Sequence, residues 1–194
     1  MQLQSELLAR GRVEALLISR DCKKITVRRN YYRGKVFDLV NKLLGMKLPV
    51  IRTKLTAYHI RDGKVIGIRE VYDRLVTTAG VNYLVDALQN IVEPENLKFH
   101  AAGTGVAAEA AGDTTLGTEV ETRASGTTVE GASANIYRTV GTVSFTATRA
   151  ITEHGVLSAS SAGTLLDRSV FTAINVVNGD SIQFTYELTL PSGG

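Results

Sequence analysis

The three histidines, His59, His100 and His154, and the single cysteine, Cys22, are the side chains most able to bind a metal or act as nucleophiles. They lie far apart in the sequence, and no HxxxH or CxxC spacing is present to bring zinc ligands together. We expect His59 and His100 to be strand residues at a surface or boundary, and His154 to lie in a turn without a catalytic role. Lys24 could lower the pKa of Cys22, but a lone thiol in a polar segment is usually incidental. The pattern therefore predicts no metal, no cofactor and no enzymatic activity.

The stretch Gly103-Thr104-Gly105 could be read as a phosphate-binding loop. A Walker loop requires a lysine followed by serine or threonine and then a helix, and no lysine follows here. We therefore expect a turn after a strand. The sequence contains no G-x-S-x-G elbow. The acidic pair Glu119 and Glu121 falls in a stretch of low hydrophobicity, where a carboxylate has no burial to raise its pKa for acid catalysis.

Charge divides the chain into two parts. Residues 1–74 carry 17 Lys and Arg against 7 Asp and Glu, whereas residues 75–194 carry 5 against 12. The single cysteine excludes an intrachain disulfide and is typical of assembly in a reducing cytoplasm. No apolar run approaches the roughly 20 residues that a membrane helix needs, and the N-terminus lacks the pattern of a secretory signal.

The basic part holds a cluster in which cationic side chains surround two tyrosines. Such a cluster can bind nucleic acid through phosphates and stacking, or dock on an acidic protein surface. Docking is favoured, because the same chain carries an acidic domain that a neighbouring copy could offer. The predicted interface residues are Lys23, Lys24, Arg28, Arg29, Tyr31, Tyr32 and Arg33, together with the apolar Phe37, Val40, Leu43 and Leu44.

Residues 1–52 are predicted to form an extended basic arm with helical segments. Apolar residues over 1–20 favour a helix that Gly11 weakens, and residues 35–46 have clearer helical spacing that ends at Gly45. A segment of about 50 residues seldom builds its own core. We therefore expect the arm to pack on another subunit; the alternative is a small helical subdomain folded back on its own chain.

Residues 53–194 are predicted to form one β domain. The Asp62-Gly63 pair between two β-rich runs indicates a hairpin. Residues 77–90 favour a helix that Thr77 or Thr78 caps. Its apolar face is predicted to consist of four residues, namely Val81, Leu84, Val85 and Leu88.

The last stretch, 165–190, alternates apolar and polar residues from Ile182 to Leu190 and has a tight-turn signal at Asn178-Gly179-Asp180. We expect it to be a long antiparallel hairpin, preceded by strands over 97–101, 136–147 and 151–157. Residues 101–134 contain 24 Ala, Gly, Ser or Thr and are expected at the surface or against another chain, because small residues bury little area. The predicted fold is mainly β, an antiparallel β-sandwich or jelly roll with one short helix.

Four segments in this order resemble a family of tailed-bacteriophage virion proteins: LVTTAGVNYLVDAL, LKFHAAGTGVAAEAAGDTTLGTEV, ITEHGVL and TLLDRSVFTAINVVNGDSIQFTYELTL. The resemblance covers the C-terminal three-fifths of the chain and does not extend to residues 1–74. The matching residues are Gly103, Thr104, Gly105, Asp113, Thr114, Leu116, Gly117, Glu119, Ile151, Thr152, Glu153, Gly155, Arg168, Val170 and Phe171.

The resemblance implies a structural β-sandwich module of capsids, necks, baseplates or tail fibres, without catalytic residues. We expect a capsid decoration or cement protein, found in virions that assemble in the host cytoplasm. Its expected partners are copies of itself, with a trimer favoured, and other virion proteins such as the major capsid protein. A neck, baseplate or fibre-attachment protein is the alternative. A carbohydrate-binding module is a further alternative from another class, although the chain has no tryptophan for a sugar platform.

Overall fold

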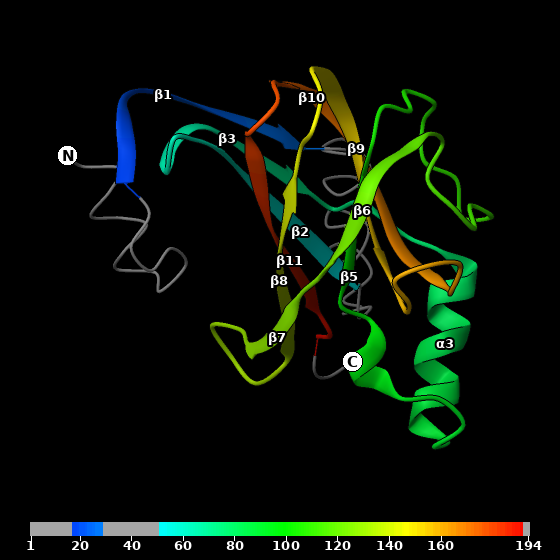
Figure 1. Cartoon of the computed structure of the whole chain (residues 1–194). Coiled ribbons are helices and arrows are strands. Elements are labelled where there is room, and N and C mark those ends of the chain that lie inside the picture. The colour runs from blue at the N-terminus through cyan, green and yellow to red at the C-terminus, as the bar shows by residue number, and fades with distance from the viewer. Residues whose placement is uncertain (1–16, 29–50, 192–194) are drawn as a thin grey trace, which may run out of the picture.

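The computed structural model describes residues 17–28 and 51–191, which form a two-sheet β-sandwich (Figure 1). The six-stranded sheet has the order β1 (Leu17–Arg28), β3 (Lys64–Tyr72), β2 (Arg52–Arg61), β11 (Ser181–Thr189), β8 (Ile136–Ser144), β7 (Thr127–Glu130). The five-stranded sheet has the order β4 (Leu75–Val76), β10 (Leu165–Val176), β9 (Arg149–Leu157), β5 (Phe99–Gly103), β6 (Glu119–Ser125). The mainly β fold expected from the sequence is confirmed.

The core lies between the two sheets, and β11 supplies its centre. Ile182, Phe184, Tyr186 and Leu188 alternate along this strand, and none is more than 1% exposed. Because side chains in a strand alternate between faces, these four point toward the other sheet while the residues between them face outward. The alternation seen in the sequence therefore marks the central strand of the larger sheet, which pairs with β2 on one side and β8 on the other.

The C-terminal stretch does not form the hairpin that its sequence predicts. A turn is present between β10 and β11, with Gly179 at φ 92°, but β10 lies in the five-stranded sheet and β11 in the six-stranded sheet. The chain therefore crosses from one layer to the other at this turn instead of pairing with itself. A turn signal between two apolar strands gives no information about which sheet each strand joins, because both sheets bury one face in the same core.

The hairpin predicted at Asp62-Gly63 is confirmed: β2 and β3 pair antiparallel across it. Asp62 and Gly63 have φ values of 49° and 70°, which are the left-handed conformations that a two-residue hairpin turn requires. This hairpin places β3 beside β1, and the two run parallel.

The single described α-helix, α3 (Thr78–Leu88), begins where the sequence predicts, and the Thr77 side chain caps it by accepting from the Gly80 amide. Its orientation differs from the prediction. Val81, Val85 and Leu88 are 41%, 46% and 89% exposed, whereas Gly80 is buried. Gly80 sets this orientation, since a Cβ there would lie 2.6 Å from the Leu166 carbonyl oxygen on β10.

Contacts with the sandwich core come from Leu84, the one residue of the predicted face that packs there, and from Tyr83, which was not predicted. Tyr83 and Leu84 are only partly buried but pack against the core residues. Close approach at a glycine thus decides the rotation of the helix, and the apolar residues on its far side remain in solvent.

The small-residue stretch, 101–134, is more structured than expected. It contains the end of β5 and two strands, β6 and β7, so that Glu119 and Glu121 lie in a strand and not in a loop. Ala101, Ala102 and Gly103 are buried. Small residues here permit close packing of backbone against side chains, because a Cβ on Gly103 would lie 2.5 Å from the Glu153 carboxylate.

Of the predicted arm, residues 17–28 and 51–52 lie within the described structure; the first segment forms edge strand β1, and Arg52 begins β2. Strand β1 begins inside the stretch whose apolar spacing favoured a helix, because pairing with β3 supplies its backbone hydrogen bonds. The helix predicted over 35–46 lies outside the described residues. In the described part of the chain, no helix has the length and apolarity needed to cross a membrane.

Candidate functional site

Glu153 on β9 is the centre of a buried network that holds the 104–118 loop. Its carboxylate accepts hydrogen bonds from the backbone amides of Gly105 (2.9 Å), Gly117 (3.0 Å) and Thr118 (2.7 Å). Arg168 on β10 forms an ion pair with it, at 2.7 Å between Nη2 and Oε2. Glu153 is 0% and Arg168 3% exposed, so this charge pair lies inside the protein. We call Glu153, Arg168 and the loop amides they hold the clasp.

Arg168 also connects the clasp to Asp113, inside the loop. Its Nη1 donates to Asp113 at 3.0 Å, and Asp113 accepts from the backbone amide of Ala110. Burial alone would raise the pKa of Glu153, but the amides of Thr118 and Gly117 and the guanidinium of Arg168 outweigh it and lower this pKa. Glu153 is therefore held as a carboxylate, which suits an anchor and does not suit a general acid near neutral pH.

A neighbouring ion pair fixes the middle of the same loop. Glu109 is 7% exposed, forms an ion pair with Arg74 at 3.2 Å and accepts from the Val170 amide at 2.7 Å. The 104–118 loop is thus held to β10 at two points.

Glycines in the loop make room for the clasp. A Cβ on Gly103 would lie 2.5 Å from Glu153 Oε1, and one on Gly105 would overlap the same carboxylate. A Cβ on Gly117 would approach Arg168 Nη2 to 3.0 Å. The Gly103-Thr104-Gly105 stretch that resembles a phosphate loop therefore binds a carboxylate of its own chain.

Two histidines that are distant in sequence lie side by side in the core. His100 Nδ1 and His154 Nε2 are 3.0 Å apart, and both side chains are 0% exposed. The prediction of a surface or turn position is wrong for both, because β5 and β9 pair antiparallel and bring them onto one face. A hydrogen bond between two ring nitrogens needs one N–H and one lone pair, so at least one ring is neutral.

Burial keeps this histidine pair uncharged. It lowers the pKa of His100 to about 3, and lowers that of His154 well below its usual value with a further contribution from His100. Phe184 lies beside His154 at 4.3 Å between ring centroids, and Thr139 is 3.2 Å from His100 Nε2. The pair is therefore a neutral part of the core.

His59 on β2 is also buried, at 7% exposure, contrary to the expected boundary position. Its Nε2 is 2.7 Å from Asp180 Oδ2, and Arg61 donates to both oxygens of the same carboxylate. Burial would raise the pKa of Asp180, but Arg61 and His59 lower it strongly. Asp180 thereby joins the β10–β11 turn to β2.

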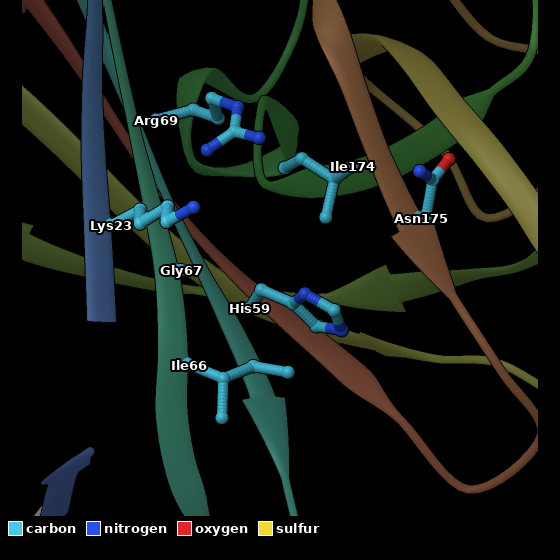
Figure 2. Close-up of a pocket in the computed structure, with 7 residues that line it drawn as sticks. All are labelled: Lys23, His59, Ile66, Gly67, Arg69, Ile174 and Asn175. Carbon is cyan, nitrogen blue, oxygen red and sulfur yellow. The ribbon is translucent and has the colours of Figure 1, made fainter. Parts of the chain in front are cut away.

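A cavity of about 190 Å³ lies next to His59, between the β1–β3–β2 side of the larger sheet and β10 of the smaller one (Figure 2). Its wall consists of cationic, polar and aliphatic side chains. The lining residues are Lys23, His59, Ile66, Gly67, Arg69, Ile174 and Asn175.

The predicted interface residues are only partly described. Lys23 lines the cavity, Lys24 forms an ion pair with Glu70 at 3.0 Å, and Arg28 is the last residue of β1. The described part of the basic cluster is thus bound into its own sheet. Arg29, Tyr31, Tyr32, Arg33, Phe37, Val40, Leu43 and Leu44 lie outside the described residues.

An exposed apolar stripe runs along α3. Val81, Val85 and Leu88 follow one another at intervals of four and three residues, and Ile91 beyond the helix is 64% exposed. Residues spaced in this way share one face of a helix. Contiguous exposed apolar surface of this kind is typical of a protein interface.

The residues that matter most in the clasp, Glu153 and Arg168, have no recognisable spacing with each other or with the loop. Their signal in the sequence is the ordered set of motifs, and the structure brings Gly105, Asp113 and Gly117 from that set into contact with them. Within residues 17–28 and 51–191, no group of three or more His, Cys, Asp or Glu is arranged to hold a metal ion. No protein-family model, curated protein or solved structure matches this chain.

Proposed function

We propose that this chain is a structural protein of a tailed-bacteriophage particle, acting as a capsid decoration or cement subunit. The observation that carries the proposal is the convergence of the motif residues on the clasp. Gly105, Asp113, Gly117, Glu153 and Arg168 belong to three separate motifs of the resemblance, and all meet in one buried network. The ordered motifs therefore correspond to one structural unit, as expected if they specify a shared fold.

The clasp supports a role in assembly and not in chemistry. Its carboxylate is already saturated by three backbone amides and a guanidinium. A catalytic carboxylate needs access to a substrate, and Glu153 is 0% exposed. Fixing a 15-residue loop on the outside of a sandwich instead gives a rigid surface, which lowers the entropy cost of binding a neighbour.

We assign the contact with neighbouring subunits to the apolar stripe of α3 and to the residues that precede β1. The stripe is exposed on the outer side of the helix, where side chains of a partner can cover it. Because β1 belongs to the chain's own sheet, residues 1–16 are the part of the arm that can be deleted from the N-terminus without removing a strand.

The proposal is tested by measuring incorporation into particles. Purified phage particles are expected to contain the full-length chain in many copies, and a variant lacking residues 1–16 is expected to show reduced occupancy while remaining folded. This deletion is preferable to removing residues 1–50, because it leaves β1 in place. Absence of the protein from purified particles would refute the proposal. A few copies per particle, located at the tail, would favour a neck, baseplate or fibre component over a cement protein.

A further inference from the structure

The cavity beside His59 is lined by cationic, polar and aliphatic side chains. Lys23, Arg69 and His59 line it from the β1–β3–β2 side, and Ile174 faces them from β10, whereas the Asn175 side chain lies on the other side of that strand (Figure 2). None of the seven described lining residues is acidic. Asp180 is near, but His59, Arg61 and the Val177 amide already use its oxygens. Lys23 and Arg69 therefore bring positive charge to the cavity, and none of the described lining residues balances it.

Arg69 is the strongest sign of a missing partner. Its Nη1 and Nη2 donate to the carbonyls of Ile68 and Ala173, both at a long 3.3 Å. Its Nε is buried and has no hydrogen-bond partner among the described residues. Arg69 is partly buried, and this burial lowers the pKa of its guanidinium, because a charge removed from water is costly unless it is paired. An anion in the cavity would supply the missing interaction.

His59 is oriented so that it can contribute. Asp180 fixes its Nε2 at 2.7 Å, which turns Nδ1 toward Gly67 on the cavity wall. A Cβ built on Gly67 would lie 4.0 Å from this Nδ1, so the missing side chain at position 67 keeps the nitrogen accessible. This nitrogen is a polar group of the cavity wall.

We propose that this cavity binds a small organic oxyanion, a carboxylate or a phosphate monoester, with the charged group between Arg69 and Lys23. Guanidinium groups bind such planar or tetrahedral oxyanions through paired N–H donors. This assignment does not depend on the proposed role in phage particles.

The aliphatic walls indicate an organic ligand and not a bare inorganic ion. Ile66 and Ile174 line the cavity together with the cationic side chains. Ligand sites commonly combine apolar walls with a few polar groups that fix orientation. We therefore expect phenyl phosphate or benzoate to bind more tightly than inorganic phosphate or acetate.

Binding is tested by isothermal titration of the full chain with these four probes at constant ionic strength. Saturable binding of phenyl phosphate or benzoate with a Kd of about 1 mM or tighter is expected. Arg69→Gln should weaken it by about tenfold or more, because a charged hydrogen bond is lost. A preference for benzoate would identify a carboxylate ligand, and a preference for phenyl phosphate would identify a phosphate ester.

Three variants keep the test decisive if Arg69→Gln fails to fold. Lys23 is exposed, so Lys23→Gln should weaken binding without affecting folding. Gly67→Val should fill the cavity and abolish binding, since a Cβ at Gly67 makes only ordinary contacts, the nearest at 3.7 Å. Lys64→Gln removes the same charge from an exposed residue of β3 outside the cavity and should leave affinity unchanged.

Two outcomes would overturn the proposal. One is the absence of saturable binding for all four probes to the folded protein. The other is an equal loss of affinity in Lys64→Gln and Lys23→Gln, which would show that general positive charge attracts the anion and that the cavity plays no part.

Discussion

Glu153 Oε2 and Arg168 Nη2 form an ion pair of 2.7 Å between strands β9 and β10, and both side chains are almost fully buried. A buried ion pair rarely adds stability over an apolar pair of the same shape, but removing one partner leaves an uncompensated charge in the interior. Here the pair also satisfies three backbone amides of the 104–118 loop. The clasp therefore explains why a loop rich in small residues has a fixed position.

Glu153→Gln is expected to destabilise the protein by about 3 kcal/mol, because Arg168 would lose its fully buried counter-charge and keep only the partly exposed Asp113. Urea unfolding followed by circular dichroism measures the change. The double variant Glu153→Gln with Arg168→Met should lose less than the sum of the two single variants, since the residues interact directly. Glu130 is exposed, so Glu130→Gln controls for the removal of one negative charge and should change stability by less than about 0.5 kcal/mol. Additive effects of the two clasp variants would contradict the account.

Two glycines in the same loop provide a matched pair. Gly105→Ala should cost about 1–3 kcal/mol, because its Cβ would overlap the Glu153 carboxylate. Gly112→Ala meets no atom within 4 Å and should be neutral or slightly stabilising. Thermal unfolding of both variants checks the difference, and equal melting temperatures would show that the clasp does not enclose Gly105.

The histidine pair predicts loss of stability in acid. The folded-state pKa of each ring lies below its unfolded value, so stability is fully present above about pH 6.5 and is lost as pH falls toward the folded pKa of about 3 for His100. Each histidine should cost about 2 kcal/mol at pH 5 relative to pH 7, because the unfolded chain takes up its proton first.

Asp167 opposes this trend in the same pH range. Burial raises its pKa to about 7, so its contribution to stability is present below its unfolded pKa and is lost as pH rises through 7. The acid loss from the histidines should therefore be steeper in Asp167→Asn than in the wild-type protein. Urea midpoints between pH 7 and pH 5 measure both slopes, and equal slopes would refute the assignment to Asp167.

Because the apolar stripe of α3 is exposed, a substitution there is expected to reduce incorporation into particles without unfolding the protein. Val85→Glu should change the free energy of unfolding by less than about 1 kcal/mol, because Val85 is 46% exposed, but should reduce occupancy in particles. Val129 on β7 is 43% exposed, so Val129→Glu is the matched control. It should also change the free energy of unfolding by less than about 1 kcal/mol, but it should leave occupancy unchanged. Equal occupancy for the two variants would remove the stripe from the proposed interface.

Local signals in the sequence predicted local structure well. The Asp62-Gly63 hairpin, the Thr77 cap and the alternation from Ile182 to Leu188 are all confirmed, because each depends on neighbours in the chain. The prediction of a terminal hairpin was wrong, because long-range packing decides which strands pair. The predicted buried face of the helix was wrong for three of its residues, because the close contact at Gly80 decides which side of the helix faces the core.

The clasp could be predicted only as a set of motifs and not as a contact. Glu153 lies 48 residues from Gly105 and 15 from Arg168, and no short-range spacing rule connects positions so distant. The same holds for His100 and His154, which only the pairing of β5 with β9 brings together. Long-range strand pairing is therefore the part of this fold that composition and periodicity leave undetermined.

The most direct test of the central claim is electron cryomicroscopy of phage particles that carry this protein. We predict density for the two-sheet sandwich on the particle, with Val81, Val85 and Leu88 of α3 covered by a neighbouring subunit. Density that leaves this face of the helix in solvent, or particles that contain no copy of the sandwich, would contradict the account.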